Sequence, residues 1–293
     1  MSGDGARLPK RMTVLDLSRL RAAGRPIVAV TAYTTPEGRC CDEAGVDLVL
    51  VGDSLGRAVL GLPDELRVTM ADMERHTAAV ARGVHRALLV ADLPFLSYQV
   101  DLGQAVRNAG RLIRAGAAAV KLEGGMAQLP AIERILAAGI PVIGHLGFTP
   151  QSVHLLGGAR VQGRVRKDAD RLLVEARAIA AAGVSAVVLE MVPAALAAEV
   201  TRVLDVPTIG IGAGPGCAGQ ILVLYDLIGL SARVPRLART YADLGAAMAT
   251  AVAAYAGDVR TGAFPTAEQS HDGRGWGGTA VVEGAGVPGE DVP

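Results

Sequence analysis

The stretch AAVKLEGG, from Ala118 to Gly125, contains the pattern that decides the fold class. A short apolar run, Ala118–Leu122, leads to an acid, Glu123, and then to a glycine turn. Similar runs, each followed by a turn and an Ala- and Leu-rich segment, recur along residues 27–225. Such runs are typical of parallel strands that helices cover on both faces. The runs are Ile27–Ala32, Leu48–Gly52, Ala87–Ala91, Ala118–Leu122, Pro141–His145, Ala186–Leu189, Pro207–Ile211 and the weaker Ile221–Tyr225.

Eight units of this kind predict an α/β fold, a closed (β/α)8 or TIM barrel. An open, doubly wound sheet is the alternative, but it would usually have fewer strands and a phosphate-binding glycine loop after the first one. Here the first run ends in Thr31-Ala32-Tyr33-Thr34 instead. We expect the catalytic barrel to span residues 13–265, between a flexible arm at 1–12 and a glycine-rich, disordered tail at 266–293.

The composition favours a cytoplasmic enzyme that acts on a small molecule. Basic and acidic residues each number 29, so no net charge attracts nucleic acid or an anionic membrane. The three cysteines, Cys40, Cys41 and Cys217, are odd in number and lack metal-ligand spacing, which favours a reducing compartment. The sequence has no apolar run long enough to span a bilayer and no apolar signal core at its N-terminus.

Ionisable residues stand at the ends of five consecutive predicted strands. In a barrel of this type the carboxyl ends of the strands surround one mouth, where the chemistry takes place. A single acid at such a position could equally cap the next helix. Five at the same rim instead predict a functional site. They are Asp53 with its neighbour Ser54, Asp92, Glu123, His145 and Glu190.

Lys121 adds a positive charge to this rim. It is one of only three lysines, and it lies two residues before Glu123, so strand alternation places both side chains on one face. Lys121 can neutralise a bound carboxylate or enolate; the alternative is a structural ion pair with Glu123. Carboxylates without a Cys/His cluster predict a hard cation such as Mg²⁺, and the isolated His145 is expected to donate a hydrogen bond to substrate.

Six longer motifs carry a resemblance to a known family. They are VGDSLG (51–56), ADLPF (91–95), VKLEGG (120–125), GHLGFTPQS (144–152), VQGR (161–164) and IGIGAG (209–214). From about Met12 to Ser270 the chain resembles ketopantoate hydroxymethyltransferases. The resemblance implies a barrel of the phosphoenolpyruvate/pyruvate superfamily, Mg²⁺ as cofactor and a homodecamer of two pentameric rings. It also implies transfer of a hydroxymethyl group from 5,10-methylenetetrahydrofolate to 3-methyl-2-oxobutanoate, giving ketopantoate for pantothenate synthesis.

The same resemblance implies a role for each residue at the rim. The cation would chelate the carboxylate and 2-oxo oxygen of the substrate, and the enolate formed by proton removal would attack the one-carbon unit. The implied roles are magnesium binding for Asp53, Asp92 and, through water, Glu123; substrate binding for Asp53, Ser54, Asp92, Lys121 and His145; and proton acceptance for Glu190.

Some positions depart from the family pattern. Thr34 stands where the family usually has Asp, and Gln269 where it has His; the segments 157–160 and 230–235 also differ. Because these positions border the expected mouth, a paralogue that acts on a different 2-oxo acid is one alternative. A folate-independent, magnesium-dependent lyase or mutase of the same superfamily is another, and a non-catalytic scaffold barrel is the least favoured.

Overall fold

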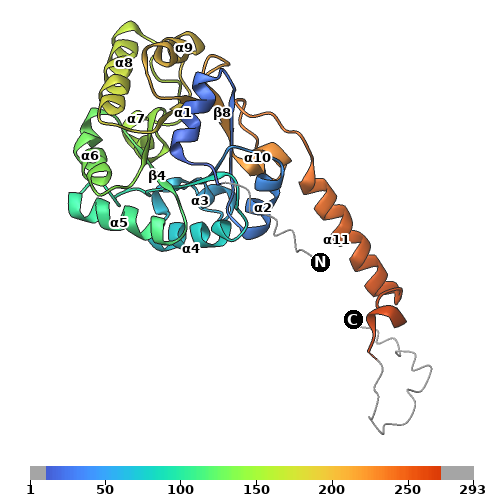
Figure 1. The fold of residues 1–293 in the computed structure, drawn as a ribbon. Helices are drawn as coiled ribbons and strands as arrows, with labels where there is room; N and C mark the ends of the chain where they lie inside the picture. The colour runs from blue at the N-terminus through green and yellow to red at the C-terminus, as the bar shows by residue number, and fades with distance from the viewer. Residues whose placement is uncertain (1–10, 272–293) are drawn as a thin grey trace, which may run out of the picture. The chain divides into compact units, whose positions relative to one another are not determined.

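The computed structural model describes residues 11–271, and it confirms the predicted barrel (Figure 1). Eight parallel strands pair in sequence order, and β8 pairs with β1 to close the barrel. Residues 1–10 of the predicted arm and 272–293 of the predicted tail lie outside the described residues. The strands are β1 Ile27–Thr31, β2 Leu48–Val51, β3 Leu88–Asp92, β4 Ala119–Glu123, β5 Val142–Gly147, β6 Ala186–Glu190, β7 Thr208–Ile211 and β8 Gly219–Leu222.

The eighth strand differs from its predicted position. The apolar run Ile221–Tyr225 was expected to form it, but β8 begins at Gly219 and ends at Leu222, and Leu224 already belongs to helix α10. Gly219 pairs with Ile27 of β1, and a Cβ atom at this position would collide with the backbone of Ile27. The close approach of two backbones, rather than an apolar side chain, therefore selects the first residue of β8.

Helices and short 3-10 turns fill the connections between strands. Helix α4 begins with a capping box, because Thr69 accepts a hydrogen bond from Asp72 N at 3.2 Å and Asp72 accepts one from Thr69 N at 3.0 Å. The elements of the barrel unit are α1 Val14–Ala22, α2 Thr35–Glu43, α3 Leu55–Ala58, η1 Glu65–Arg67, α4 Met70–Ala81, α5 Leu102–Arg114, η2 Met126–Gln128, α6 Leu129–Ala137, η3 Pro150–Ser152, α7 Val153–Leu156, α8 Arg166–Ala181, α9 Ala194–Val203 and α10 Leu224–Ile228.

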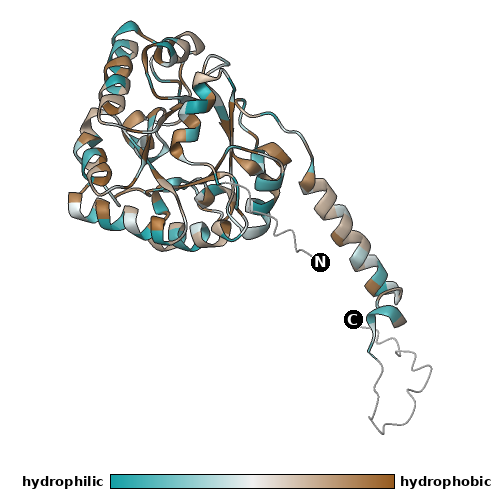
Figure 2. Ribbon diagram, viewed as in Figure 1, coloured by the Kyte–Doolittle hydropathy of each residue, from teal (hydrophilic) through white to brown (hydrophobic). Residues whose placement is uncertain are grey.

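Apolar side chains on the two faces of the strands form two cores. Inside the barrel, Val90, Ile143 and Val188 pack together, and Leu17 of α1 belongs to the same cluster. The alternate residues, such as Leu89, face the surrounding helices and join a larger cluster with them. Figure 2 shows the strands as largely hydrophobic. This two-sided burial explains why the strands have near-continuous apolar sequences.

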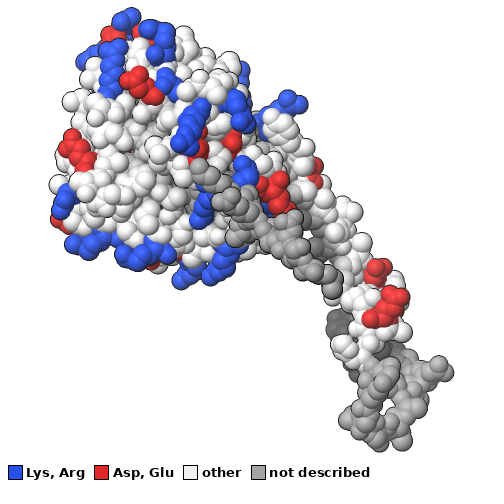
Figure 3. All heavy atoms as spheres, viewed as in Figure 1, with Lys and Arg blue, Asp and Glu red and all other residues white. Residues whose placement is uncertain are grey.

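Charged side chains lie mainly on the outer helices of the barrel unit. Figure 3 shows Lys and Arg atoms distributed over the helices of this face, with Asp and Glu atoms among them. Within residues 11–271 no helix is long and apolar enough to cross a membrane.

The described chain divides into two compact units, residues 11–244 and 245–271. Almost all of α11, Leu244–Thr261, lies in the second unit, followed by η4, Ala267–Gln269. No residue of α11 is buried. Its large apolar side chains follow each other at intervals of three or four residues, so they share one face of the helix. They are Leu244, Met248, Val252, Tyr255 and Val259.

Candidate active site

Register between neighbouring strands brings the predicted site residues together at the carboxyl end of the barrel. Asp92 of β3 is the partner of Lys121 in β4, and Glu123 is the partner of His145 in β5. Glu190, at the end of β6, pairs with Gly147. The predicted site residues all line one pocket of about 540 Å³; they are Asp53, Ser54, Asp92, Lys121, Glu123, His145 and Glu190.

Lys121 forms an ion pair with Asp92 rather than with Glu123. Its Nζ lies 3.1 Å from Asp92 Oδ1 and 3.3 Å from His145 Nδ1. His145 in turn lies between two carboxylates: Nδ1 is 3.5 Å from Glu123 Oε1, and Nε2 is 3.3 Å from Glu190 Oε2. A continuous row of ionisable side chains, with Lys121 and His145 between carboxylates, therefore runs from β3 to β6 across the barrel mouth.

Asp53 and Ser54 follow β2 and lie beside Asp92. The backbone N–H of Asp53 donates to Asp92 Oδ2 at 3.1 Å. The hydroxyl groups of Ser54 and Tyr33 share a hydrogen bond of 2.9 Å. Asp53 and Asp92 are 4% and 2% exposed, so two carboxylates are held next to each other away from water.

Gln151 holds the acidic groups in place. Its side-chain Nε2 donates to Asp53 Oδ2 at 2.8 Å and to the carbonyl of Leu93, while its backbone N–H donates to Glu123 Oε2 at 2.9 Å. The hydroxyl of Tyr98 donates to Gln151 Oε1 at 2.9 Å. One residue of η3 thus fixes carboxylates at the carboxyl ends of two different strands.

Burial and charge shift the pKa values of this group. Burial, together with the charge of Asp92, raises the pKa of Asp53 well above its usual value. Burial also raises the pKa of Asp92, although Lys121 opposes this rise. For Lys121 the neighbouring carboxylates outweigh burial and raise the pKa. Burial and Lys121 lower the pKa of His145, but its two carboxylate neighbours outweigh them and raise it to about 9.

Two buried atoms of the site form no hydrogen bond with any residue in the range 11–271. They are Asp92 Oδ1 and His145 Nε2. Their neighbours at ion-pair distance are Lys121 and Glu190. Buried polar atoms are usually hydrogen-bonded, and those that are not often mark the position of a ligand.

The three acids predicted to hold magnesium do not form a ready-made metal cluster. In the described part of the chain, no three His, Cys, Asp or Glu side chains lie together in an arrangement suited to an ion. Glu123 Oε2 accepts the backbone N–H of Gln151. Asp53 and Asp92 remain adjacent, so a site built from this chain would begin with these two carboxylates.

Glu190 is placed by a tight backbone junction between β5 and β6. The backbone N–H of Phe148 donates to the carbonyl of Glu190 at 2.8 Å. Gly147 has φ +96, and a Cβ atom there would collide with the same carbonyl. The next residue, Met191, has φ 46, which is unusual for a residue with a side chain. Only glycine at 147 allows the two strand ends to approach this closely.

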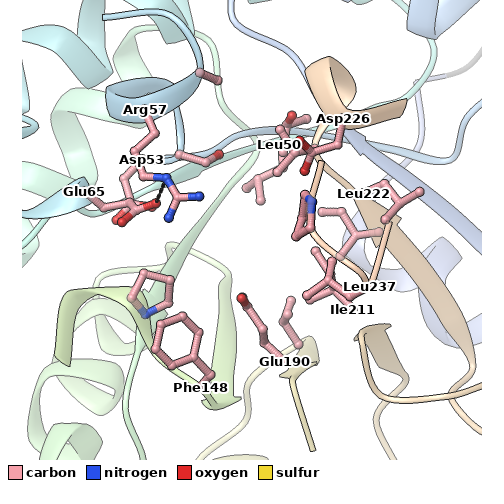
Figure 4. Close-up of a pocket in the computed structure, with 18 of the residues that line it drawn as sticks. Leu50, Asp53, Arg57, Glu65, Phe148, Glu190, Ile211, Leu222, Asp226 and Leu237 are labelled. Carbon is pink, nitrogen blue, oxygen red and sulfur yellow. Dashed lines mark ion pairs between the residues drawn. The ribbon is translucent and has the colours of Figure 1, made fainter. Parts of the chain in front are cut away.

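The pocket also contains charged residues that the strand-end pattern did not predict. Arg57 of α3 and Glu65 of η1 face it, with Nε of Arg57 3.6 Å from Glu65 Oε1 (Figure 4). Burial raises the pKa of Glu65, and Arg57 opposes that rise. Asp226 of α10 lines the pocket as well. These residues come from loops and short helices, where strand periodicity gives no signal.

The positions that depart from the family pattern have different surroundings. Thr34 caps α2, accepting a hydrogen bond from Glu37 N at 3.4 Å. Ala159 of the segment 157–160 and five residues of 230–235 line the pocket. Gln269 belongs to η4 in the second unit, where its side chain accepts a hydrogen bond from Thr266. The two segments, but not the side chain of Thr34, therefore line the pocket wall.

Comparison with known proteins identifies relatives over most of the chain. Residues 11–267 match the sequence profile of the family described as ketopantoate hydroxymethyltransferase. A 3-methyl-2-oxobutanoate hydroxymethyltransferase of Pyrobaculum islandicum is 54% identical over 259 residues, covering 88% of this chain and 98% of the relative. One from Geotalea daltonii is 50% identical over 261 residues, with the same coverage.

Solved structures of lower identity share the fold. A phosphonopyruvate hydrolase crystallised with oxalate and Mg²⁺ has a TM-score of 0.57 at 15% identity, covering 88% of this chain and 93% of that one. A 2,3-dimethylmalate lyase of the PEP mutase/isocitrate lyase superfamily has a TM-score of 0.57 at 19% identity, covering 87% and 90%. At these identities the likeness establishes the barrel architecture alone.

Proposed function

Because the chain belongs to the ketopantoate hydroxymethyltransferase family, we propose that it transfers a hydroxymethyl group to 3-methyl-2-oxobutanoate and so forms ketopantoate. The observation that carries this proposal is the convergence of Asp53, Asp92, Lys121 and Glu190 on one pocket. Such a set can bind an anionic 2-oxo acid and remove a proton from the carbon next to its carbonyl group.

Glu190 is the base in this proposal. Its carboxylate lines the pocket, and His145 Nε2 lies 3.3 Å from Glu190 Oε2, where it can orient the base. Lys121, which is 5% exposed, can stabilise the negative charge that moves onto the substrate oxygens as the proton leaves. Ser54 offers a hydroxyl at the same wall. These residues would bind, orient and deprotonate the 2-oxo acid.

The residues at the mouth fit a divalent cation. Asp53 and Asp92 provide oxygen donors, which Mg²⁺ prefers, and Asp92 Oδ1 accepts no hydrogen bond from residues 11–271. Burial and mutual repulsion raise the pKa of Asp53, so a cation would also relieve an unfavourable pair of charges. When bound, the cation would act as a Lewis acid toward the 2-oxo group. Glu123 would contribute through water.

The one-carbon donor in this proposal is 5,10-methylenetetrahydrofolate. The β-carbon of the 2-oxo acid loses its proton and forms a bond to the methylene carbon, and both bonds from that carbon to nitrogen break. Water supplies the hydroxyl oxygen of the product. The substrate proton and the remaining proton of water end on the two nitrogens of tetrahydrofolate, so atoms and charges balance.

Self-association is also part of the proposal. The apolar side chains that share one face of α11, including Met248 and Val252, are 59% and 64% exposed. An apolar surface of this kind is typical of a contact with another protein, and the family resemblance implies a homodecamer. Sedimentation analysis would measure the assembly. The cytoplasmic location and the extent of the N-terminal arm and C-terminal tail stay predictions.

The test is an assay of ketopantoate formation from 3-methyl-2-oxobutanoate, with and without 5,10-methylenetetrahydrofolate and with Mg²⁺ or EDTA. We expect turnover that needs both the folate and the cation. A parallel NMR measurement follows exchange of the β-proton for deuterium, which needs no one-carbon donor. Turnover of a 2-oxo acid without folate would instead favour a lyase or mutase, and absence of exchange and transfer would refute the proposal.

A further inference from the structure

The pocket has two chemically different sides (Figure 4). One side carries Asp53, which is one of the two acids proposed to hold the cation, and the Arg57–Glu65 ion pair. The other side is formed by apolar side chains, including Ile211, Leu222 and Leu237, together with Asp226. Glu190 lies between the two sides. A reactant on the apolar side would therefore face the same base as a reactant on the charged side.

Asp226 is the unexplained group of the apolar side. The residue is 8% exposed and belongs to α10, directly after β8. Its backbone carbonyl accepts a hydrogen bond from Thr240, but among residues 11–271 its carboxylate has no hydrogen bond or ion pair. Asp226 lines the pocket, and its carboxylate oxygens are not among the fully enclosed atoms of residues 11–271 that lack a hydrogen bond. The carboxylate is therefore open to the pocket, where N–H groups of a bound molecule can reach it.

Three donors from residues near Asp226 form hydrogen bonds with other groups. The Tyr33 hydroxyl shares its hydrogen bonds with Thr31 and Ser54, both at 2.9 Å. The Tyr225 hydroxyl donates to Glu37 at 3.1 Å, and the backbone N–H of Leu224 donates to Thr31 at 3.0 Å. These three groups therefore form hydrogen bonds with residues other than Asp226, whose carboxylate lines the pocket.

The 2-oxo acid cannot be the molecule that binds Asp226. 3-Methyl-2-oxobutanoate carries oxygen acceptors and a negative charge but no N–H or O–H donor at neutral pH, and a second carboxylate would repel it. A ligand of Asp226 must present hydrogen-bond donors, and a ligand of the apolar wall must present a flat or apolar surface. A reduced pterin ring combines both features, because its faces are flat and one edge carries an amino group and a ring N–H.

We propose that Asp226 binds the N–H edge of the pterin ring of the one-carbon donor, with the ring lying against the apolar side of the pocket. This inference rests on the proposed function. A carboxylate can accept two parallel N–H donors from such an edge, as it does from an arginine. The ring is then held opposite the charged side, and its one-carbon unit is directed toward the enolate beside Glu190.

The test separates the two reactants by measuring two reactions of one variant. Asp226→Asn keeps the shape of the side chain but removes its charge and one acceptor. We expect the Michaelis constant for 5,10-methylenetetrahydrofolate to rise at least about tenfold, because a hydrogen bond to a charged group is lost. The ratio of transfer rate to deuterium-exchange rate should fall by a similar factor. Calorimetric titration with tetrahydrofolate should show a matching loss of affinity.

Asp168→Asn serves as the matched control, because Asp168 lies on α8 and does not line the pocket. A fall of exchange and transfer by the same factor in Asp226→Asn would assign Asp226 a structural role and overturn the inference. Unchanged affinity for tetrahydrofolate would overturn it as well. If the unsubstituted enzyme showed neither reaction, the proposed function itself would fail, which is a different result from a defect confined to the variant.

Discussion

The interior of the barrel and its carboxyl-terminal rim are built by the same faces of the same strands, yet they have opposite chemistry. Val90, Ile143 and Val188 pack in an apolar interior layer. Two residues further along each strand, on the same face, stand Asp92, His145 and Glu190. One step of strand alternation thus separates side chains that stabilise the fold from side chains that place charges in a buried pocket.

The barrel therefore has two layers with different roles. The lower layer is the apolar interior around Val90, Ile143 and Val188, and the upper layer is the set of polar side chains at the carboxyl-terminal rim. The lower layer can be filled with apolar residues, because closure of the sheet removes it from water. The upper layer holds groups such as Asp53 and Asp92, whose raised pKa values show that burial opposes their charged forms. We therefore expect substitutions in the upper layer to change activity far more than stability, and substitutions in the lower layer to do the reverse.

The largest effect is expected at the base. Glu190→Gln should lower deuterium exchange and hydroxymethyl transfer about 100- to 10,000-fold, because the proton acceptor is lost. Thermal unfolding should change little, since glutamine has the same size and loses a partly buried charge. NMR exchange and calorimetric melting measure the two quantities. Exchange at the normal rate would remove Glu190 from the mechanism.

The converse change in the interior layer comes next. Ile143 is 1% exposed and stands two residues before His145. Ile143→Ala should lower the free energy of unfolding by about 2–5 kcal/mol, because it leaves a cavity in a packed interior. Urea unfolding followed by circular dichroism gives this value. Activity per folded molecule should be kept; a large loss would show that the two layers are not independent.

Lys121 offers a smaller effect within the upper layer. Lys121→Met keeps most of the side-chain volume but removes the charge next to Asp92, so kcat/KM for the 2-oxo acid should fall about 10- to 100-fold. Lys167→Met, at an exposed position of α8, is the control. Steady-state kinetics at varied 2-oxo acid concentration measure kcat/KM for each variant. Equal kcat/KM values for Lys121→Met and Lys167→Met would contradict the prediction.

The smallest effect concerns a carboxylate far from the rim. Asp42, on α2, accepts backbone N–H groups of His85, Arg86 and Ala87 at 2.7–3.0 Å, just before β3. Burial raises its pKa, but these donors outweigh burial and hold the pKa below its usual value. The stabilisation is therefore present above the unfolded-state pKa and is lost as the pH falls through the lower, folded-state value.

Asp42→Asn should accordingly cost about 1 kcal/mol of stability at pH 7. The difference between the variant and the parent should shrink as the pH is lowered below about 4, because Asp42 takes up a proton there in the unfolded parent and only at lower pH in the folded parent. Denaturant unfolding at pH 7 and pH 3 measures this change. A difference that does not depend on pH would show that the charge of Asp42 has no part in the stabilisation.

The sequence predicted the lower layer and the strand ends well, for a physical reason. Strands buried on both faces must be apolar along their length, so a break such as Asp92 or Glu190 marks the point where a strand reaches solvent or ligand. The same rule misplaced β8, because Gly219 is selected by close backbone contact and leaves no hydrophobic signal. The partner of Lys121 in its ion pair could not be predicted for a related reason. Strand alternation gives the face on which a side chain lies but not its neighbour on the next strand.

The rest of the site could not be predicted from strand periodicity. Gln151 lies in the motif that suggested the family, but its contacts with Asp53 and Glu123 depend on how η3 folds over the barrel mouth. Arg57, Glu65 and Asp226 come from short helices, whose positions are set by packing in three dimensions. Loops carry much of the function of a barrel, and their geometry is the part that local sequence rules describe least.

The backbone junction at Gly147 has a consequence for reading mutational scans. Every other residue at this position would push against the carbonyl of Glu190, and its φ of +96 adds strain for any side chain. In a saturation mutagenesis screen scored by growth, Gly147 should therefore tolerate as few replacements as the proposed base, although it has no functional group. Intolerance at Glu190 would then come from loss of the proposed base, and intolerance at Gly147 from steric collision with a carbonyl. Only purified variants assayed for both folding and deuterium exchange would separate these two causes.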